Sequence, residues 1–430
     1  MSKVLLIDYG ASRIKSVLYD SINDLPIASF ESEGSFVKYG NYNKIPGSFF
    51  SKSLILHLDY YSNEVFNLKE DYELEIYICS EMHGFSLLEQ DNLKSTYYYS
   101  WRFKNNSTDL ALEILSDRGF HNKTSMILRP GLPVVNILAK SLNNEIKDGS
   151  TFLTLPQLIC YELGDHYNLG CKTLLHSSGF YTDLGNKEDS FGITGIDLPI
   201  YFPSVLDDYK NPLGFIKYND KRYNLYFGFG DLQAAFFGSN LNETEILINI
   251  GTGSQIISNF KNKSTFGLEE RPFFDDEKLK CVTHIPAGRF LNSWCKFYDR
   301  LNSKNNFWKE LSLLNYEDFE PSGIDIKFDL YLDSESEYFE AIRHLTLNNS
   351  TITSKVLLSS LIKSFCNQYL SYLNGSIDKS SKIILGGGIP SKIPIIANII
   401  EMNIDREVNV KKDQHDLTLI GLRDFINRVF

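Results

Sequence analysis

Residues 4–20 read VLLIDYGASRIKSVLYD, and this stretch decides the predicted fold. Two short apolar runs flank a turn that contains Asp8, Gly10 and Ser12, with Lys15 just beyond it. Short runs rich in Val, Ile, Leu and Tyr around such a turn predict a β-hairpin. Most turns of this kind only reverse the chain, but their backbone N–H groups can also converge on a phosphate. The rest of the sequence decides between these interpretations.

The same pattern returns near the middle of the chain. An apolar run from Ile246 to Ile250 precedes Gly251-Thr252-Gly253-Ser254, and a second apolar run follows. Aligning Gly10 with Gly251 places Leu5-Leu6-Ile7 opposite Ile246-Leu247-Ile248. A repeat at this spacing is far longer than that of a solenoid. The pattern therefore predicts an internal duplication of whole domains.

A third glycine turn lies near the C-terminus. Residues 382–385 predict a strand, Gly386-Gly387-Gly388 a turn, and residues from Ser391 onward a helix with isoleucines on one side. Three such turns favour nucleotide binding, because a nucleotide needs contacts to its phosphates and to its adenosine. A carboxylate near the phosphates could hold Mg²⁺, so Asp8 is the predicted metal ligand.

Gly228-Phe229-Gly230-Asp231 leads into a helix-forming run at residues 232–235. An aspartate at a helix start often serves only as its cap. The alternative role is a general base that accepts the proton of a substrate hydroxyl as its oxygen attacks phosphorus. A capping residue does not need the close backbone approach that the two glycines allow. The context of Asp231 thus leaves both roles, helix cap and general base, open at this point.

Met82-His83-Gly84 follows residues 74–79, which predict a buried strand. Side chains just beyond the carboxyl end of such a strand can face a ligand cleft. The functional interpretation is that His83 contacts a sugar hydroxyl. The alternative, a histidine hydrogen-bonded within the fold, stays open. Further helices are predicted at residues 136–142, 152–163, 290–301 and 355–372.

Length and composition predict a protein of two large domains. The chain has 430 residues, of which 43% are hydrophobic and 23% charged, as in ordinary globular proteins. A net charge of −11 disfavours a nucleic-acid or anionic-membrane partner. The six cysteines are scattered without a C-x-x-C pair, which is typical of free thiols. No signal-peptide or membrane-spanning pattern is recognisable, so we expect a cytoplasmic protein.

These motifs, in this order, resemble those of FGGY-family carbohydrate kinases, which belong to the sugar kinase, heat-shock chaperone and actin superfamily. The first phosphate motif, D-x-G-[TS]-[TS]-x-x-[KR], matches residues 8–15, and the sugar motif S-G-Q-M-H-G matches Cys79–Gly84. The catalytic motif G-D-x-Q-A-A matches Gly230–Ala235, which makes Asp231 the implied catalytic base. The closing G-A-A segment is like Ile420-Gly421-Leu422. The resemblance extends over nearly the whole chain.

The resemblance implies an α/β fold of two duplicated ribonuclease-H-like domains with a cleft between them. Residues 1–241 would bind the sugar and residues 242–430 the nucleotide. ATP and Mg²⁺ are the implied cofactors, with Asp8 near the metal. The implied contacts to ATP come from Gly10, Ser12, Lys15, Gly251, Thr252, Gly253, Gly386, Gly387, Gly388 and Ser391. The implied contacts to the sugar come from Met82, His83, Arg102, Asp231 and Gln233.

Several positions depart from the family motifs. Ala11 stands where a threonine is usual, and Glu81 replaces the usual glutamine. The family's W-x-D-x-R is represented by Tyr98-Tyr99-Ser100-Trp101-Arg102, in which only the arginine matches. Gly421-Leu422 lacks the small alanine pair. These departures concern the choice of sugar more than the phosphoryl transfer.

The motif style around Asp231 and the second phosphate turn is most similar to that of sedoheptulokinases. We therefore predict ATP-dependent phosphorylation of a ketose, such as sedoheptulose or another heptulose. A pentulose, another sugar or a polyol is the alternative acceptor, since glycerol kinases share D-x-Q-A-A. A nucleotide-gated sugar-binding regulator and an ATPase with a protein partner are alternatives of other classes. The sequence leaves the oligomeric state open.

Overall fold

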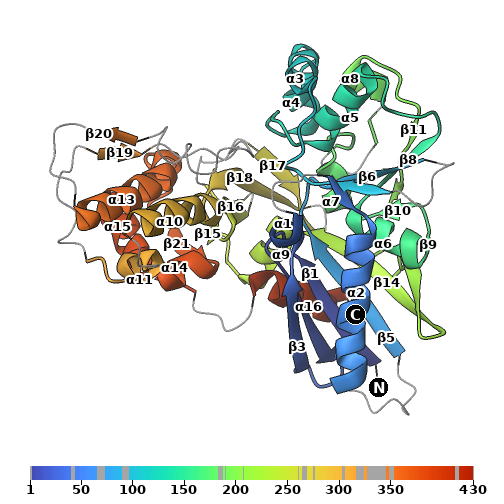
Figure 1. Cartoon of the computed structure of the whole chain (residues 1–430), viewed down its shortest axis with the longest axis horizontal. Helices are drawn as coiled ribbons and strands as arrows, with labels where there is room; N and C mark the ends of the chain where they lie inside the picture. The colour runs from blue at the N-terminus through green and yellow to red at the C-terminus, as the bar shows by residue number, and fades with distance from the viewer. Residues whose placement is uncertain are drawn as a thin grey trace. The chain divides into compact units, whose positions relative to one another are not determined.

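The computed structural model describes residues 2–39, 44–64, 73–89, 96–182, 187–188, 190–206, 208–259, 261–263, 269–274, 277–302, 306–315, 324–326, 345–347, 353–411 and 416–429. The chain forms two compact units (Figure 1). Unit 1 comprises Met1–Gly238, Glu270–Lys278 and Thr418–Phe430, and unit 2 comprises Ser239–Glu269 and Leu279–Leu417. The two short returning segments of unit 1 differ from the predicted single division at 241/242. The functions predicted for the two halves stay predictions.

The main sheet of unit 1 has the strand order β3-β2-β1-β5-β14-β13-β9. The strands β3, β2 and β1 are antiparallel, whereas β1, β5 and β14 run parallel to one another. Leu5, Leu6 and Ile7 of β1 are completely buried, as expected of a central strand covered on both faces. A smaller sheet has the order β11-β8-β6-β7-β4.

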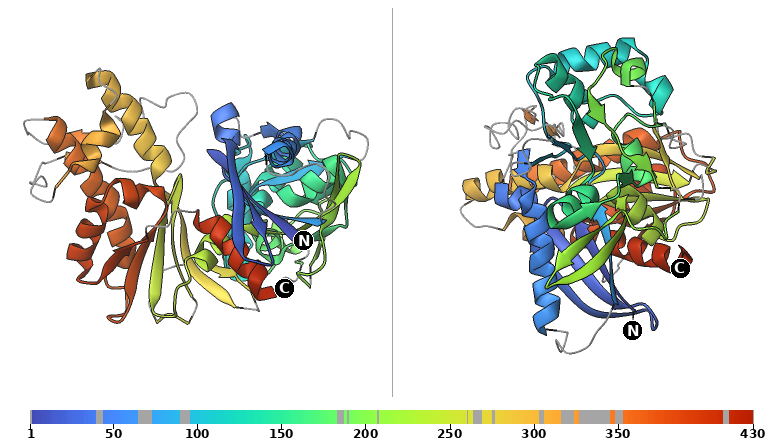
Figure 2. Two further views of the ribbon diagram at one scale, coloured as in Figure 1. Left: turned by 90° about the horizontal axis from the view of Figure 1, so that it is seen from below. Right: turned by 90° about the vertical axis from the view of Figure 1, so that its right-hand side faces the viewer.

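The strands of unit 1 are β1 (Ser2–Tyr9), β2 (Arg13–Asp20), β3 (Leu25–Glu33), β4 (Lys44–Pro46), β5 (Glu73–Ser80), β6 (Phe85–Leu88), β7 (Tyr97–Tyr99), β8 (Ser150–Leu153), β9 (Gly164–His166), β10 (Leu169–Gly170), β11 (Ile200–Tyr201), β12 (Ser204–Val205), β13 (Gly214–Tyr218) and β14 (Lys221–Gly230). Its helices are α1 (Ser35–Tyr39), α2 (Ser48–Glu64), α3 (Thr108–Asp117), α4 (Phe120–Thr124), α5 (Pro133–Leu142), α6 (Leu155–Leu163), α7 (Lys172–His176), α8 (Ser190–Thr194), α9 (Asp231–Gly238) and α16 (Leu417–Val429). The returning segment 270–278 includes most of β17 (Glu269–Pro272). In Figure 2, α16 (red) lies beside the first strands (dark blue), and residues of β1 and α16 line one small cavity.

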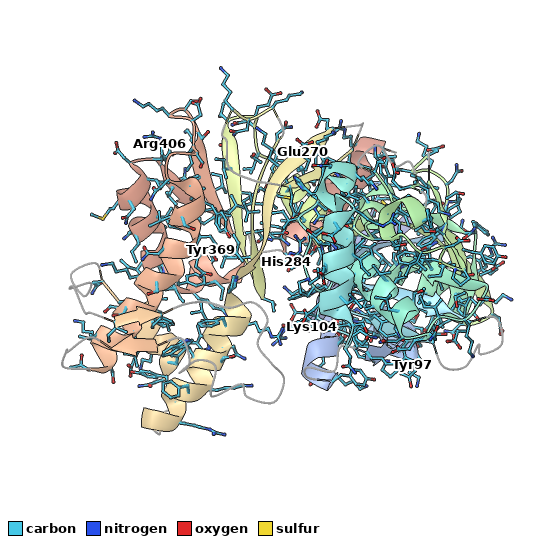
Figure 3. All side chains as sticks on the ribbon, turned by 90° about the horizontal axis from the view of Figure 1, so that it is seen from above. Tyr97, Lys104, Glu270, His284, Tyr369 and Arg406 are labelled. Carbon is cyan, nitrogen blue, oxygen red and sulfur yellow. The ribbon has the colours of Figure 1, made fainter. Side chains whose placement is uncertain are left out.

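Unit 2 contains β15 (Glu245–Ile250), β16 (Gly253–Asn259), β18 (Lys278–Pro286), β19 (Ile324–Ile326), β20 (Leu345–Leu347), β21 (Lys382–Gly386) and β22 (Val408–Val410). Its helices are α10 (Gly288–Asn302), α11 (Phe307–Ser312), α13 (Ser354–Leu373), α14 (Gly388–Lys392) and α15 (Ile395–Ile404). The helices pack into an apolar core around Trp294 and Phe365, which includes Tyr369 of α13, labelled in Figure 3.

The two main sheets share one topology. In unit 2 the strands follow the order β18-β16-β15-β21-β22. The pairs β18/β16 and β16/β15 are antiparallel, and β15/β21 and β21/β22 are parallel. These directions are those of β3-β2-β1-β5-β14 in unit 1. The predicted duplication is therefore visible in the strand order of both units.

Local prediction located most helices but missed two breaks. The helices predicted at residues 136–142, 290–301 and 355–372 lie within α5, α10 and α13. The helix predicted over 152–163 was wrong at its start, because β8 extends to Leu153 and a capping box of Thr154 and Gln157 starts α6 at Leu155. The helix predicted from Ser391 onward was also wrong: α14 ends at Lys392, and Pro394 separates it from α15.

All six cysteines are free thiols. In the part of the chain that the structure describes, no helix combines the length and the apolar character needed to cross a membrane.

Candidate active site

Three parallel strands of unit 1 end at the same edge of the main sheet. Tyr9 of β1 pairs with Ser80 of β5, and Ser80 pairs with Gly230 of β14. The residues that follow these strands therefore lie side by side. Among them are the predicted phosphate turn at Gly10, the predicted sugar segment at Met82 and the predicted base Asp231. The carboxyl edge of a parallel sheet is where α/β proteins bind ligands.

Asp8 is buried next to this edge. Its carboxylate oxygen Oδ2 accepts a hydrogen bond from Thr418 Oγ1 at 2.9 Å, and Lys15 stands opposite Asp8 in the β1/β2 register. Thr418 comes from the returning C-terminal segment, and no local sequence signal connects it with Asp8. The contact fixes the orientation of the carboxylate that was predicted to hold the metal.

The first phosphate turn is closed by a tight backbone contact. The N–H of Gly34 donates to the carbonyl of Ser12 at 3.0 Å, and a Cβ atom on Gly34 would clash with the carbonyl of Ala11. A Cβ atom on Gly10 would lie 2.6 Å from the Arg13 carbonyl oxygen. Glycine is therefore required at residues 10 and 34 for the turn to keep this shape.

Asp231 is the first residue of α9 and is partly buried. Its Oδ1 accepts a hydrogen bond from the Leu232 N–H at 2.9 Å. Burial raises the pKa of Asp231 to about 7, and the nearby charge of Glu81 acts in the same direction. A carboxyl group with a pKa close to neutral can both take up and release a proton, as a general base requires.

Met82 and Gln233 flank the residue that precedes Asp231. A Cβ atom on Gly230 would lie 2.5 Å from Met82 Cγ and 2.5 Å from Gln233 Oε1. Glycine at position 230 therefore allows both side chains to approach the backbone closely. Gln233 is completely buried, and its Nε2 donates to the Pro272 carbonyl at 3.2 Å. The returning segment 270–278 thus holds Gln233 in place.

His83 is buried, and its ring is held within unit 1. Nδ1 lies 2.9 Å from the carbonyl oxygen of Ser177. Because a carbonyl only accepts hydrogen bonds, Nδ1 carries the proton and Nε2 accepts from Arg129 Nη2 at 3.4 Å. Burial, with the charges of Arg271 and Arg129, holds the pKa of His83 well below its usual range. His83 is therefore neutral, and its predicted sugar contact stays a prediction.

Arg102 belongs to a hydrogen-bonded network at the same edge. Its Nε donates to Ser100 Oγ at 3.0 Å, and Ser100 Oγ donates to Glu81 Oε2 at 3.2 Å. Tyr98 covers Gly84 so closely that a Cβ atom at position 84 would clash with the Tyr98 hydroxyl. This contact explains why glycine follows Met82-His83. The network therefore joins Glu81 and Ser100, two of the residues that differ from the family motifs.

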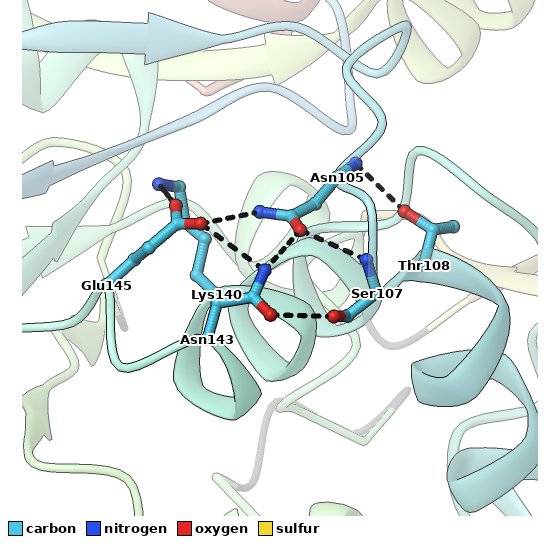
Figure 4. Close-up of polar contacts among 6 residues, drawn as sticks. All are labelled: Asn105, Ser107, Thr108, Lys140, Asn143 and Glu145. Carbon is cyan, nitrogen blue, oxygen red and sulfur yellow. Dashed lines mark hydrogen bonds and ion pairs between the residues drawn. The ribbon is translucent and has the colours of Figure 1, made fainter.

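Polar side chains form a hydrogen-bonded cluster just beyond Arg102, here called the polar clamp (Figure 4). Its members are Asn105, Ser107, Thr108, Lys140, Asn143 and Glu145. Lys140 Nζ pairs with Glu145 Oε2 at 2.9 Å and lies 4.7 Å from the ring centroid of Tyr99. Asn143 Nδ2 donates to Asn105 Oδ1 at 2.7 Å. The clamp connects the end of α5 to the segment that carries Ser100 and Arg102. Sequence analysis did not find it, because its members are polar residues spread over 40 positions.

In unit 2 the second phosphate turn and the third glycine turn are neighbours. Asn249 of β15 pairs with Gly386 of β21, so Gly251 and Gly387 follow adjacent parallel strands. Gly387 has φ +86°, and a Cβ atom there would clash with the Ile250 carbonyl. The N–H of Gly288 donates to the Gly251 carbonyl at 3.0 Å. The glycine turns predicted to bind ATP in unit 2 therefore lie next to each other.

Two of these glycines have no packing role in the fold. A Cβ atom on Gly253 or Gly388 would meet no atom of the described residues within 4 Å. Both residues are exposed, as are Thr252 and Ser391. The absence of a side chain at 253 and 388 is therefore not needed for packing. It leaves the backbone accessible to a ligand.

A magnesium ion fits this arrangement through Asp8. Among the described residues, no group of three or more His, Cys, Asp and Glu side chains could hold a metal ion. Protein sites for Mg²⁺ in phosphoryl-transfer enzymes often use one or two carboxylates, the substrate phosphates and water. Asp8 supplies a buried carboxylate of that kind.

The sequence matches no protein-family model and no curated protein. The structure is similar to those of several carbohydrate kinases. Xylulose kinase from Lactobacillus acidophilus has a TM-score of 0.73 at 16% identity, with 100% of this chain and 89% of that chain covered. Gluconate kinase from the same organism has a TM-score of 0.71 at 15% identity, covering 99% and 89%. Plasmodium falciparum glycerol kinase with ADP has a TM-score of 0.67 at 12% identity, covering 98% and 88%.

These similarities confirm the predicted fold class. The protein has the same α/β fold as these kinase structures, with one ribonuclease-H-like main sheet in each unit. At these identities the comparison shows the fold alone.

Proposed function

We propose that the protein transfers the γ-phosphoryl group of ATP to a hydroxyl group of a sugar. The observation that carries the proposal is the convergence of Asp8, Met82 and Asp231 at one edge of the unit 1 sheet. The similar structures of xylulose, gluconate and glycerol kinases support it. Unit 1 supplies the acceptor site and unit 2 the principal nucleotide site.

Asp231 accepts the proton of the acceptor hydroxyl while the hydroxyl oxygen forms a bond to the γ-phosphorus in line. The bond between the γ-phosphorus and the β,γ-bridging oxygen breaks, and ADP leaves with that oxygen. Its pKa of about 7 allows this transfer near neutral pH. A positioned base of this kind contributes about 10²- to 10⁴-fold to the rate. Met82 and Gln233 pack beside it and orient the acceptor, and Arg102 adds a positive charge to the same site.

The glycine turns bind the nucleotide. Residues 251–253 hold phosphate oxygens through backbone N–H groups, and Gly386–Gly388 with Ser391 lie against the adenosine. Gly10, Ser12 and Lys15 contribute further phosphate contacts from unit 1. Asp8 holds Mg²⁺, which supplies neutralisation of the phosphate charge when ATP is bound.

The preferred acceptor is a ketose, and a heptulose such as sedoheptulose is the specific proposal. Its support is the motif style of Gly230–Ala234 and Ser254-Gln255. A pentulose, another sugar or a polyol is the alternative acceptor. A sugar-binding regulator without kinase activity is favoured only by Ala11 and by the altered segment 98–102. An ATPase acting on a protein partner is disfavoured by Asp231 and Met82 at the sheet edge.

ADP release from ATP·Mg²⁺ tests the proposal against a panel of heptuloses, pentuloses, hexuloses, aldoses, polyols and glycerol. We expect one class to accelerate ADP release and Asp231→Asn to abolish most of that increase. Equal ADP release with and without every acceptor would contradict the kinase function. Acceptor binding without turnover would instead favour the regulator.

A further inference from the structure

Thr418 connects the C-terminal helix α16 to the predicted metal ligand Asp8. Both residues are buried, and the Thr418 hydroxyl donates a hydrogen bond to Asp8 Oδ2 at 2.9 Å. The same carboxylate oxygen lies 3.9 Å from the position that a Cβ atom on Gly10 would take. The oxygen that Thr418 holds therefore lies beside the first phosphate turn.

One face of α16 determines where Thr418 stands. Thr418, Gly421 and Phe425 are separated by three and four residues, so they share this face, and all three are buried. A Cβ atom on Gly421 would clash with the Ala234 carbonyl of α9. The centroid of the Phe425 ring lies 4.6 Å from that of Phe229 in β14. Thr418 therefore belongs to a helix whose position is set by close contacts with α9 and β14.

A carboxylate that binds a metal ion needs a partner of this kind. The last side-chain torsion of an aspartate has only a broad preference, so its carboxylate turns unless another group holds it. Loss of a group that hydrogen-bonds to a metal ligand typically costs about 10- to 100-fold in metal affinity or activity. The hydroxyl of Thr418 has the geometry of such a partner for Asp8.

We propose that Thr418 is a positioning residue, whose hydroxyl holds the Asp8 carboxylate in the orientation that binds Mg²⁺. Thr418 acts through Asp8 and contacts neither the nucleotide nor the acceptor. The inference rests on the proposed function, in which Asp8 is the metal ligand. It extends the metal site to α16, which lies outside the phosphate and sugar motifs.

The test compares wild type with Thr418→Val, Thr418→Ser, Asp8→Asn and the double variant of Thr418→Val and Asp8→Asn. Valine keeps the branched shape of threonine without its hydroxyl, whereas serine keeps the hydroxyl. Thr194→Val is the matched control, because Thr194 is also buried in unit 1 and its hydroxyl donates to the Ser190 carbonyl at 2.7 Å. Thr194 lies on α8, which contributes no residue to the proposed site.

Metal binding is measured without an acceptor. Mn²⁺ serves as the probe for the Mg²⁺ site, because carboxylate and water oxygens suit both ions. The electron paramagnetic resonance signal of free Mn²⁺ gives the affinity of each protein–ADP complex for the metal ion. Titration calorimetry gives the affinity for ADP without metal, and urea unfolding establishes that each variant is folded.

We expect Thr418→Val to weaken Mn²⁺ binding about 10-fold, because the Asp8 carboxylate loses the partner that orients it. Thr418→Ser should stay within about 3-fold of wild type, since it keeps the charge-assisted hydrogen bond. Thr194→Val should behave as wild type, and ADP without metal should bind equally to all variants. In the double variant, Thr418→Val should add no loss to that of Asp8→Asn, because the two side chains form one interaction.

Three results would overturn the positioning role. They are wild-type Mn²⁺ affinity in Thr418→Val, equal losses in Thr418→Val and Thr418→Ser, and unchanged affinity in Asp8→Asn. Formation of a phosphorylated acceptor tests the proposed function separately. If wild type forms this product and Thr418→Val binds Mn²⁺ normally, only the positioning role fails. If wild type phosphorylates no acceptor, the proposed function fails, and the metal titration still decides the role of Thr418.

Discussion

The two main sheets have the same strand order, but acidic residues stand only at the carboxyl edge of the unit 1 sheet among the three positions compared. In unit 1 the corresponding positions hold Asp8, then Glu81 after β5 and Asp231 after β14. In unit 2 the same positions hold an amide, a glycine and a cation: Asn249, Gly387 after β21 and Lys411 after β22. At these three equivalent positions, unit 1 has acidic residues and unit 2 has residues without negative charge.

Under the proposed function, this difference corresponds to different roles for the two units. Acids at the edge of unit 1 can take up a proton and hold a metal ion. Asp8 lies beside a phosphate turn as a proposed ligand of Mg²⁺, whereas an acid without a metal ion beside the glycine turns of unit 2 would repel phosphate. The fold repeats the same sheet edge in both units, and in the proposed function the side chains at each edge determine whether it transfers a proton or binds phosphate.

The largest effect should come from Asp231→Asn. The amide cannot accept the acceptor proton, so kcat should fall about 10²- to 10⁴-fold. The affinity for ATP, measured by titration calorimetry, should stay within about 2-fold because the variant leaves unit 2 unchanged. A comparable loss of ATP affinity would contradict the proposal that Asp231 acts on the acceptor and that unit 2 binds the nucleotide.

Asp8 in unit 1 and Asn249 in unit 2 occupy equivalent positions, and exchanging acid and amide at each of them tests the comparison more closely. Asp8→Asn should lower kcat about 10²-fold through loss of the metal-binding carboxylate. Asn249→Asp should instead weaken ATP binding about 10-fold, because the new charge faces the phosphates. Steady-state kinetics with varied ATP and Mg²⁺ separate the two effects. Equal effects of both variants on kcat would contradict the assignment.

Gly387→Ala tests whether the stability of unit 2 depends on glycine in the turn that follows β21. The substitution combines strain at φ +86° with a clash against the Ile250 carbonyl, so unit 2 should lose about 2–4 kcal/mol of stability. Gly375→Ala is the control, since Gly375 has φ +74° but open space around its Cβ position. It should cost about 1 kcal/mol. Urea unfolding of both variants measures the difference.

Asp231→Asn should also stabilise the protein above neutral pH. Because the pKa of Asp231 is raised in the folded state, the folded protein keeps a proton that the unfolded chain loses between about pH 4 and 7. Wild-type stability therefore falls over this range relative to the variant. We expect the variant to be about 2 kcal/mol more stable at pH 8 and equal at pH 4. A stability difference between wild type and variant that does not change with pH, measured by urea unfolding, would contradict this prediction.

The smallest effect on folding should come from Gly253→Ala. A Cβ atom there meets nothing in the described residues, so the melting temperature should stay within about 1 °C. Binding of ATP should weaken about 3- to 10-fold if phosphate approaches this backbone. Unchanged binding would show that the turn at 251–253 does not contact the nucleotide.

Local chemistry made the glycine turns and the helix start at Asp231 predictable from the sequence. Gly10, Gly251 and Gly387 occupy turns between short apolar runs, and Asp231 follows glycines at a helix start, so each signal lies within a few residues. The contact of Thr418 with Asp8 and that of Pro272 with Gln233 join segments far apart in sequence. The hydrogen bond from Ser100 to Glu81 joins residues that are 19 positions apart in the sequence. Such pairings arise only from the tertiary fold, and periodicity or turn chemistry carries no trace of them.

The most direct test of the account is detection of the phosphorylated acceptor by mass spectrometry. Wild type and Asp231→Asn are incubated with ATP labelled in its γ-phosphoryl oxygens, Mg²⁺ and the acceptor panel. The account predicts a labelled phosphate ester of one acceptor with wild type and about 10²-fold less or lower with the variant. Labelled inorganic phosphate without any phosphate ester, or equal ester formation by both proteins, would contradict it.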